Sequence, residues 1–77
     1  MNNVKTFEFN GGELKYNQKL GRVQLECPMA DAIMEACGFV DYHGEGMCYV
    51  AGCTSEDVAY LLADVADRVC MLQDMKK

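Results

Sequence analysis

The last part of the chain has the residue spacing of one long amphipathic helix, from residue 54 to residue 74. Its larger apolar residues recur with the helical period and fall on one side: Val58, Leu61, Leu62, Val65, Val69 and Leu72. Thr54 is expected to cap this helix, with Asp57 three residues later in the position of a capping-box acid. Because such a helix must cover its apolar side, the rest of the chain has to supply a second layer.

A second side of the same helix carries only small residues: Ala59, Ala63, Ala66 and Cys70. Small side chains at this spacing allow another backbone to approach closely. We expect these four residues to form a helix contact across a two-fold axis, which predicts a homodimer. In the alternative arrangement, the first helix of the same chain packs there through its own alanines.

Four segments have the alternation or the apolar content of β-strands: residues 4–9, 13–16, 20–26 and 47–51. In the first three, apolar and polar residues alternate, which is typical of a sheet covered on one face and solvated on the other. Asn10-Gly11-Gly12 suits a tight hairpin turn between the first two segments. The fourth segment is apolar at every position and is therefore expected in the middle of the sheet.

A shorter helix is predicted between the third and fourth strands, with Pro28 as its first residue. Gly38 is expected to end it in a left-handed conformation, with Phe39 folding back onto the helix. The resulting element order is β-β-β-α-β-α. It predicts an α+β fold in which residues 1–77 form a single compact domain. The architecture is a two-layer sandwich, a four-stranded, mainly antiparallel sheet with two helices on one face.

Charge and cysteine content exclude several classes of protein. Twelve acidic residues against seven Lys and Arg give a formal net charge of −5, which disfavours direct binding to nucleic acid or to anionic membranes. No apolar run is long enough to span a bilayer. The five cysteines contain no C-x-x-C pair and follow no secretory signal, which favours a reducing, cytoplasmic location.

One group of residues has the chemistry of a metal or redox site: Cys37, His43, Cys48 and Cys53. Structural zinc sites usually contain a closely spaced pair of ligands, and this group lacks one. We therefore expect the cysteines to pack in the core and predict no metal and no cofactor. The loop over residues 41–46 lacks the partner groups of nucleophilic catalysis, so no catalytic residue is assigned. A metal- or redox-responsive Cys/His protein is the alternative interpretation.

The acidic side of the long helix is the candidate binding surface. Its aspartates share an outer arc with an aromatic residue and a methionine, a mixture typical of contact surfaces, although a merely solvated face is the simpler interpretation. The loop over residues 41–46 adds two polar aromatic residues to this candidate surface. The predicted partner-binding residues are Asp57, Tyr60, Asp64, Asp67, Met71, Asp74, Tyr42 and His43. They predict a non-catalytic module that binds a protein with a basic surface.

Carboxylates along a helix match the distance scale of backbone phosphates, so this face could occupy a nucleic-acid groove on another protein. A small acidic chain of this kind would suit an inhibitor of nucleic-acid machinery from a phage or mobile element, of the anti-CRISPR type. The expected function is therefore that of a protein-binding inhibitor without enzymatic activity.

Overall fold

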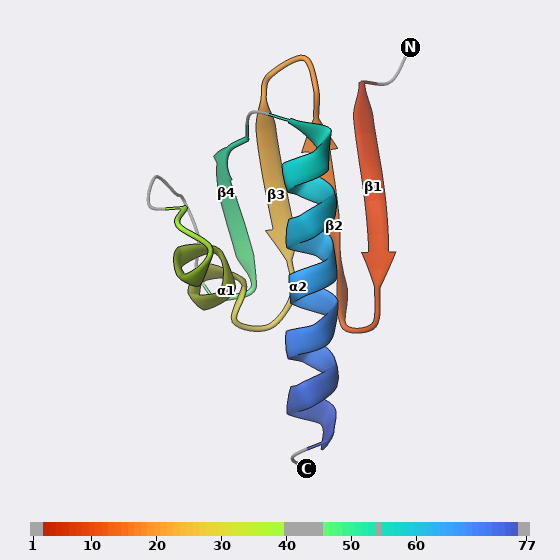
Figure 1. The fold of residues 1–77 in the computed structure, drawn as a ribbon, viewed down its shortest axis with the longest axis vertical. Helices are drawn as coiled ribbons and strands as arrows, with labels where there is room; N and C mark the ends of the chain where they lie inside the picture. Colours follow the sequence, from red (N-terminus) through yellow and green to blue (C-terminus); the bar gives the residue numbers. More distant parts are fainter. Residues whose placement is uncertain (1–2, 40–45, 54, 76–77) are drawn as a thin grey trace.

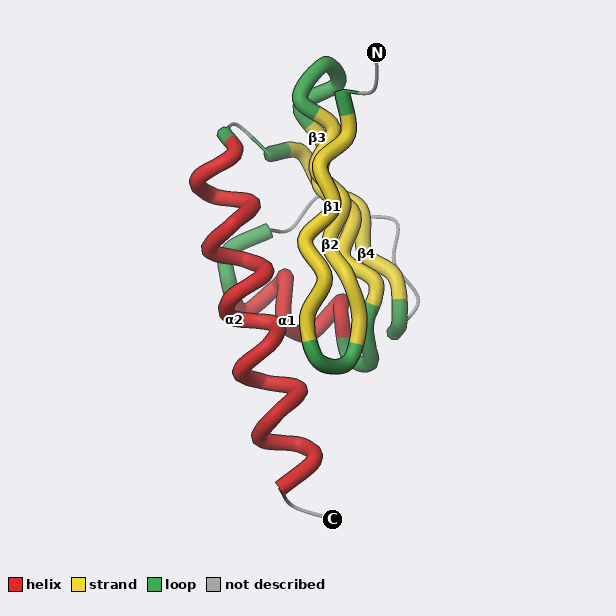
Figure 2. The backbone as a smooth tube through the Cα atoms, turned by 90° about the vertical axis from the view of Figure 1, so that its right-hand side faces the viewer, coloured by secondary structure: helices red, strands yellow, loops and turns green. Residues whose placement is uncertain are grey.

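The computed structural model describes residues 3–39, 46–53 and 55–75. Four antiparallel strands form one sheet in sequence order: β1 (Val4–Phe9), β2 (Gly12–Asn17), β3 (Arg22–Glu26) and β4 (Cys48–Gly52). Two helices, α1 (Ala30–Ala36) and α2 (Glu56–Met75), cover one face of this sheet, with α2 over β1 and β2 and α1 over β3 and β4 (Figures 1 and 2). The predicted α+β class and the order β-β-β-α-β-α are confirmed.

The C-terminal end of α1 has the predicted cap. Gly38 adopts a φ of 95°, which glycine reaches without steric cost, and its N–H donates to the carbonyl of Glu35 at 3.0 Å. The N–H of Phe39 donates to the carbonyl of Met34 at 3.0 Å, which completes a Schellman motif. Phe39 then packs against the core, as expected.

The start of α1 differs from the prediction. The helix begins at Ala30, two residues after Pro28, because Met29 takes a left-handed conformation with a φ of 63°. The N–H of Ala30 donates to the carbonyl of Gly46 at 2.7 Å, which ties the first turn to the segment that leads into β4. At the start of α2, Thr54 lies outside the described residues. The Oγ of Ser55 accepts the N–H of Val58 at 3.3 Å and caps that helix.

The prediction of a central position for the fourth strand is wrong. Among the described strands, β4 pairs with β3 alone and forms an edge of the sheet. Tyr49 and Ala51 point into the core, whereas Cys48 and Val50 lie half-buried on the open face. Its uninterrupted apolar sequence therefore reflects one buried and one half-buried face, not a position between two neighbouring strands.

The helix α2 turns a different side toward the sheet from the one predicted. Its buried residues are Ala59, Leu62, Ala63, Ala66 and Cys70. Leu62 is the one buried member of the predicted apolar stripe. Val58 and Val69 are half-buried, and Leu61, Val65 and Leu72 are exposed. The prediction that this stripe faces the core is wrong.

Residue size explains this orientation. The strands beneath α2 present large side chains to it, among them Phe7, Phe9, Leu14 and Tyr16. Small residues on the helix leave room for these side chains and allow a close approach at the packing density of a protein interior. The sheet therefore covers the small side of α2 within one chain. The prediction that Ala59, Ala63, Ala66 and Cys70 form a dimer contact is wrong, because all four are buried in this core.

Two core cysteines lie in contact where α2 passes the end of β3. Cys27 and Cys70 are both buried, and their thiols form a hydrogen bond. Burial, together with the neighbouring Cys70, raises the pKa of Cys27 from 9.0 to about 12. Cys27 therefore stays a neutral thiol in the folded protein over the ordinary pH range.

This contact predicts a loss of stability in alkali. The folded chain keeps the Cys27 proton at pH values where the unfolded chain has lost it. The contribution of the neutral Cys27 thiol to the unfolding free energy is therefore complete below pH 9.0 and disappears as the pH approaches 12. The test is to measure the unfolding free energy of the wild type and of the Cys27→Ala variant by denaturant titration at several pH values, under reducing conditions. Above pH 9.0 the unfolding free energy should fall less steeply with pH in the variant than in the wild type, by about 1 kcal/mol per pH unit. Identical slopes for the two proteins would contradict this assignment.

Candidate functional site

A groove lies between the end of β1 and the middle of α2. It has a volume of about 210 Å³ and is open to solvent. Six residues line it: Glu8, Phe9, Tyr60, Ala63, Asp64 and Asp67. The strand and the helix contribute one wall each, and an ion pair between Lys5 and Glu56 also joins β1 to the first turn of α2.

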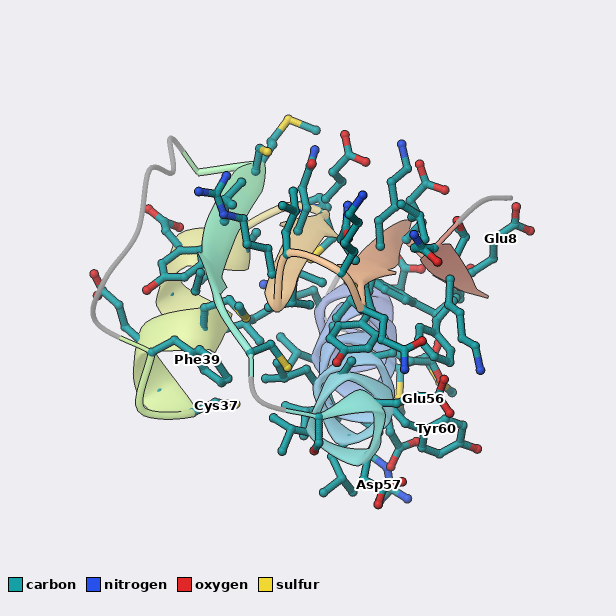
Figure 3. All side chains as sticks on the ribbon, turned by 90° about the horizontal axis from the view of Figure 1, so that it is seen from above. Glu8, Cys37, Phe39, Glu56, Asp57 and Tyr60 are labelled. Carbon is teal, nitrogen blue, oxygen red and sulfur yellow. The ribbon has the colours of Figure 1, made fainter. Side chains whose placement is uncertain are left out.

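The aromatic wall of the groove is Tyr60. Its ring packs edge-on against Phe7, with ring centroids 5.9 Å apart and an interplanar angle of 87°. The side chain remains 62% exposed, and Figure 3 shows it directed toward the β1 side of α2. The ring is thus held from one side by the strand while the rest of its surface is available for a ligand.

The two aspartates of the groove have different roles. One carboxylate oxygen of Asp67 accepts the backbone N–H of Asn10 at 3.1 Å and so fastens the β1–β2 turn to α2. Asp64 forms an ion pair with Arg68 one helical turn later, at 3.5 Å. Both partners of that pair are at least half exposed, so the pair adds little stability and leaves Asp64 accessible.

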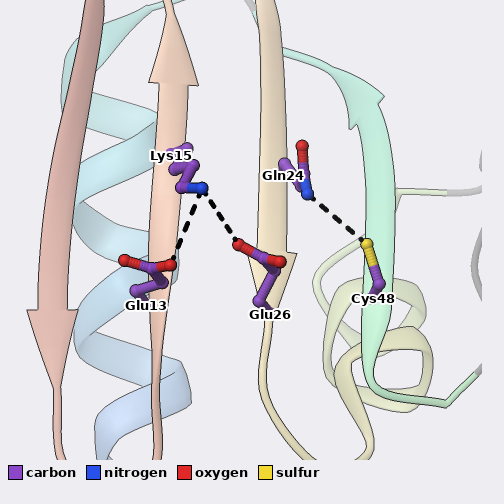
Figure 4. A network of polar contacts seen from close by, with 5 residues as sticks. All are labelled: Glu13, Lys15, Gln24, Glu26 and Cys48. Carbon is purple, nitrogen blue, oxygen red and sulfur yellow. Dashed lines mark hydrogen bonds and ion pairs between the residues drawn. The ribbon is translucent and has the colours of Figure 1, made fainter.

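Three more carboxylates lie side by side on the open face of the sheet. In the strand register Glu8 is opposite Glu13, and Glu13 is opposite Glu26. Lys15 lies between two of them, 3.7 Å from Glu13 and 3.5 Å from Glu26 (Figure 4). Like charges directly opposite each other destabilise a sheet. One lysine against three glutamates leaves this row with excess negative charge.

The two acidic groups meet at Glu8. This residue and Phe9 also line a second hollow of about 360 Å³, together with Gly12, Glu13 and Glu26. We call the combined surface the acidic rim: Glu8, Glu13, Glu26, Asp64 and Asp67. Its members come from β1, β2, β3 and α2 and surround the end of the β1–β2 hairpin.

The structure brings together some of the predicted partner-binding residues and separates others. Tyr60, Asp64 and Asp67 line the groove. Asp57 points away from the sheet at the first turn of α2 (Figure 3), Met71 is exposed, and Asp74 borders another hollow beside Gly11 and Gln73. Tyr42 and His43 lie outside the described residues.

Sequence reasoning missed the three glutamates of the rim. Strand alternation correctly placed Glu13 and Glu26 away from the core, but no local signal showed that they are adjacent. Adjacency depends on the register between strands, which the hairpin turns determine.

The proposed Cys/His group does not converge in the part of the chain that the structure describes. Cys37 is exposed at the end of α1, and desolvation raises its pKa. Cys48 accepts the Nε2–H of Gln24 at 3.6 Å on the open face (Figure 4). Cys53 is buried and donates to the carbonyl of Ser55 at 3.2 Å. His43 lies outside the described segments, within which no group of three or more His, Cys, Asp or Glu residues is arranged to hold a metal ion.

No protein-family model, curated protein or solved structure matches this chain. The described helices include none that is long and apolar enough to cross a bilayer. The geometry and charge of the acidic rim are therefore the features of this chain that indicate a function.

Proposed function

We propose that this protein is a small, non-catalytic binding module that holds a basic segment of a protein partner against the acidic rim. One observation carries the proposal: five carboxylates from four separate elements surround the end of one hairpin. Two cations, Lys15 and Arg68, form ion pairs with them in the described part of the chain. Such an excess of negative charge favours encounter with a positively charged surface.

The groove suits the shape of a basic side chain. A lysine or arginine of the partner would lie against the exposed ring of Tyr60, with Asp64 and Glu8 near its charge. Aromatic faces attract cations, and carboxylates form charge-assisted hydrogen bonds with them. Because the groove is built within a single chain, binding does not depend on oligomerisation.

The proposed class of partner follows from this chemistry. Proteins that bind nucleic acid carry basic surfaces, and the rim would compete there with phosphates. The role proposed is that of an inhibitor of nucleic-acid machinery in the cytoplasm, for which an anti-CRISPR-type protein of a phage or mobile element is one example.

Charge reversal on the rim tests the proposal. The probe is a short peptide of alternating lysine and arginine, whose binding is followed by amide chemical shifts and by fluorescence titration. The rim variant combines Glu8→Lys with Asp64→Lys. The matched control combines Glu35→Lys with Asp74→Lys, which are also exposed and change the formal net charge from −5 to −1 by the same two reversals.

We expect the rim variant to weaken peptide binding by about 10-fold or more, and the control by much less, because net charge is the same in both. In the wild type, the changes in amide chemical shift that the peptide causes should be largest around Asn10, Tyr60 and Asp64. Binding that weakens equally in both variants, with shifts spread over the whole surface, would show that only net charge matters and would refute the rim as a site.

A further inference from the structure

The side of α2 that faces away from the sheet carries an apolar stripe with no cover in the described chain. Leu61, Leu72 and Met75 are 62%, 58% and 78% exposed, and Val65 is 38% exposed. The helix also extends past the end of the sheet, so that its last turns have no strand beneath them (Figures 1 and 2). Apolar residues exposed together on one helix side mark an interaction surface.

The spacing of this surface is that of a coiled coil. It begins at Val58, which is half-buried against the core, and its members follow one another at alternating intervals of three and four residues: Val58, Leu61, Val65, Arg68, Leu72 and Met75. These are the a and d positions of successive heptads, which place a continuous seam along one side of a helix. We call these six residues the outer seam. It lies roughly opposite the small residues that contact the sheet.

The seam is complementary to itself when two helices run in opposite directions. With a two-fold axis between the levels of residues 66 and 67, Val58 faces Met75, Leu61 faces Leu72, and Val65 faces Arg68 of the second copy. We propose that α2 pairs antiparallel with α2 of a second copy of this chain through the outer seam. A surface that matches its own reversed copy forms a closed two-fold dimer.

Charge selects the antiparallel direction. A parallel pair in register would place Arg68 against Arg68 in the middle of the seam, where the two charges repel. In the antiparallel pair, Arg68 lies at the level of Val65 of the second copy and beside its Asp64. The carboxylate that already pairs with Arg68 within one chain, at 3.5 Å, is thereby shared between two arginines across the interface.

The expected dimer is weak and depends on salt. The seam is about 27 Å long at 1.5 Å per residue and lies at the small end of stable interfaces. Each chain also carries a net charge of −5, so the two copies repel. Added salt screens this repulsion and should strengthen the dimer, whereas it should weaken binding of a basic peptide at the rim. The rim and the seam meet at Asp64 and otherwise use different residues of α2, so Leu61→Lys tests the seam without changing any carboxylate of the rim.

Sedimentation across the micromolar range tests the dimer. The wild type should change from the chain mass of 8.6 kDa to twice that mass as concentration rises. Leu61→Lys should raise the dissociation constant by about 100-fold or more, because each dimer contains the change twice. The control is Leu20→Lys, at an equally exposed leucine outside α2, and it should dimerise like the wild type. Circular dichroism verifies that both variants fold.

Crosslinking tests the direction of pairing. In a Cys37→Ser background, a mixture of Leu61→Cys and Leu72→Cys chains should form the disulfide between positions 61 and 72 under mild oxidation, as mapped by mass spectrometry. Leu61→Cys chains alone should form far less of the 61–61 product. A wild type that stays at 8.6 kDa throughout, dimerisation unaffected by Leu61→Lys, or a dominant 61–61 disulfide would each overturn the proposal.

Discussion

Replacing Gly12 with alanine should unfold most of the protein. A Cβ atom at this position would lie 2.0 Å from the carbonyl oxygen of Glu26 and 2.7 Å from the Cβ of Cys27. The first of these atoms is backbone of the neighbouring strand, so the clash is relieved only by moving β2 away from β3. We expect a loss of about 3 kcal/mol or more, which is a large part of the stability of a small domain.

Gly52→Ala provides the matched control. Gly52 is also at the end of a strand, and a Cβ atom there would meet nothing within 4 Å. Its unfolding midpoint in urea should stay close to that of the wild type. If Gly12→Ala were as stable as Gly52→Ala, the close approach of the hairpin to Cys27 in the structure would be wrong.

A large polar residue at Ala66 should destabilise the protein strongly. Ala66 is fully buried where α2 meets the sheet, so Ala66→Gln both overfills the interface and buries an amide. Overpacking costs about 1 to 3 kcal/mol, and an unpaired buried polar group costs a similar amount. The expected loss is therefore about 2 to 6 kcal/mol, measured by urea denaturation.

The control for this change is Leu61→Gln on the same helix, which introduces the same side chain at a residue that is 62% exposed. At protein concentrations low enough to keep the chain monomeric, its unfolding free energy should stay within about 0.5 to 1 kcal/mol of the wild type. If the apolar stripe faced the sheet, as predicted from the sequence, Leu61→Gln would be the more destabilising of the two substitutions.

The elements themselves could be predicted from local sequence. Alternation located β1, β2 and β3, because each has one buried and one solvated face. Gly38 and Phe39 identified the end of α1, since a Schellman motif depends on residues that are neighbours in the chain. The edge position of β4 could not be inferred in this way, because partly buried Cys48 and Val50 resemble fully buried residues in sequence.

The orientation of α2 could not be predicted because hydrophobicity was weighed without regard to size. Leucine and valine are more hydrophobic than alanine. One side of the helix carries the leucines and valines, and another side carries the small residues. Which side faces the sheet depends on what the sheet presents. With Phe7, Phe9 and Tyr16 beneath the helix, small residues fit closely and large ones do not.

The candidate site was predicted only on its helical half. Tyr60, Asp64 and Asp67 are within two helical turns of one another, so their common side follows from helix geometry. Glu8 joins them from β1, and Glu13 and Glu26 join Glu8 through the pairing of three strands. Contacts between segments so distant in the chain have no local sequence signal.

The orientation of α2 underlies the acidic rim and the outer seam alike, and methyl NMR tests it directly. In a sample with labelled alanine and leucine methyls, the signals of Ala59, Ala63 and Ala66 should keep their intensity when a soluble nitroxide is added. They should also show nuclear Overhauser effects to the aromatic rings of β1 and β2, because these methyls face the sheet. Strong broadening of the alanine signals, with the methyls of Leu61 and Leu72 close to those rings instead, would contradict the account.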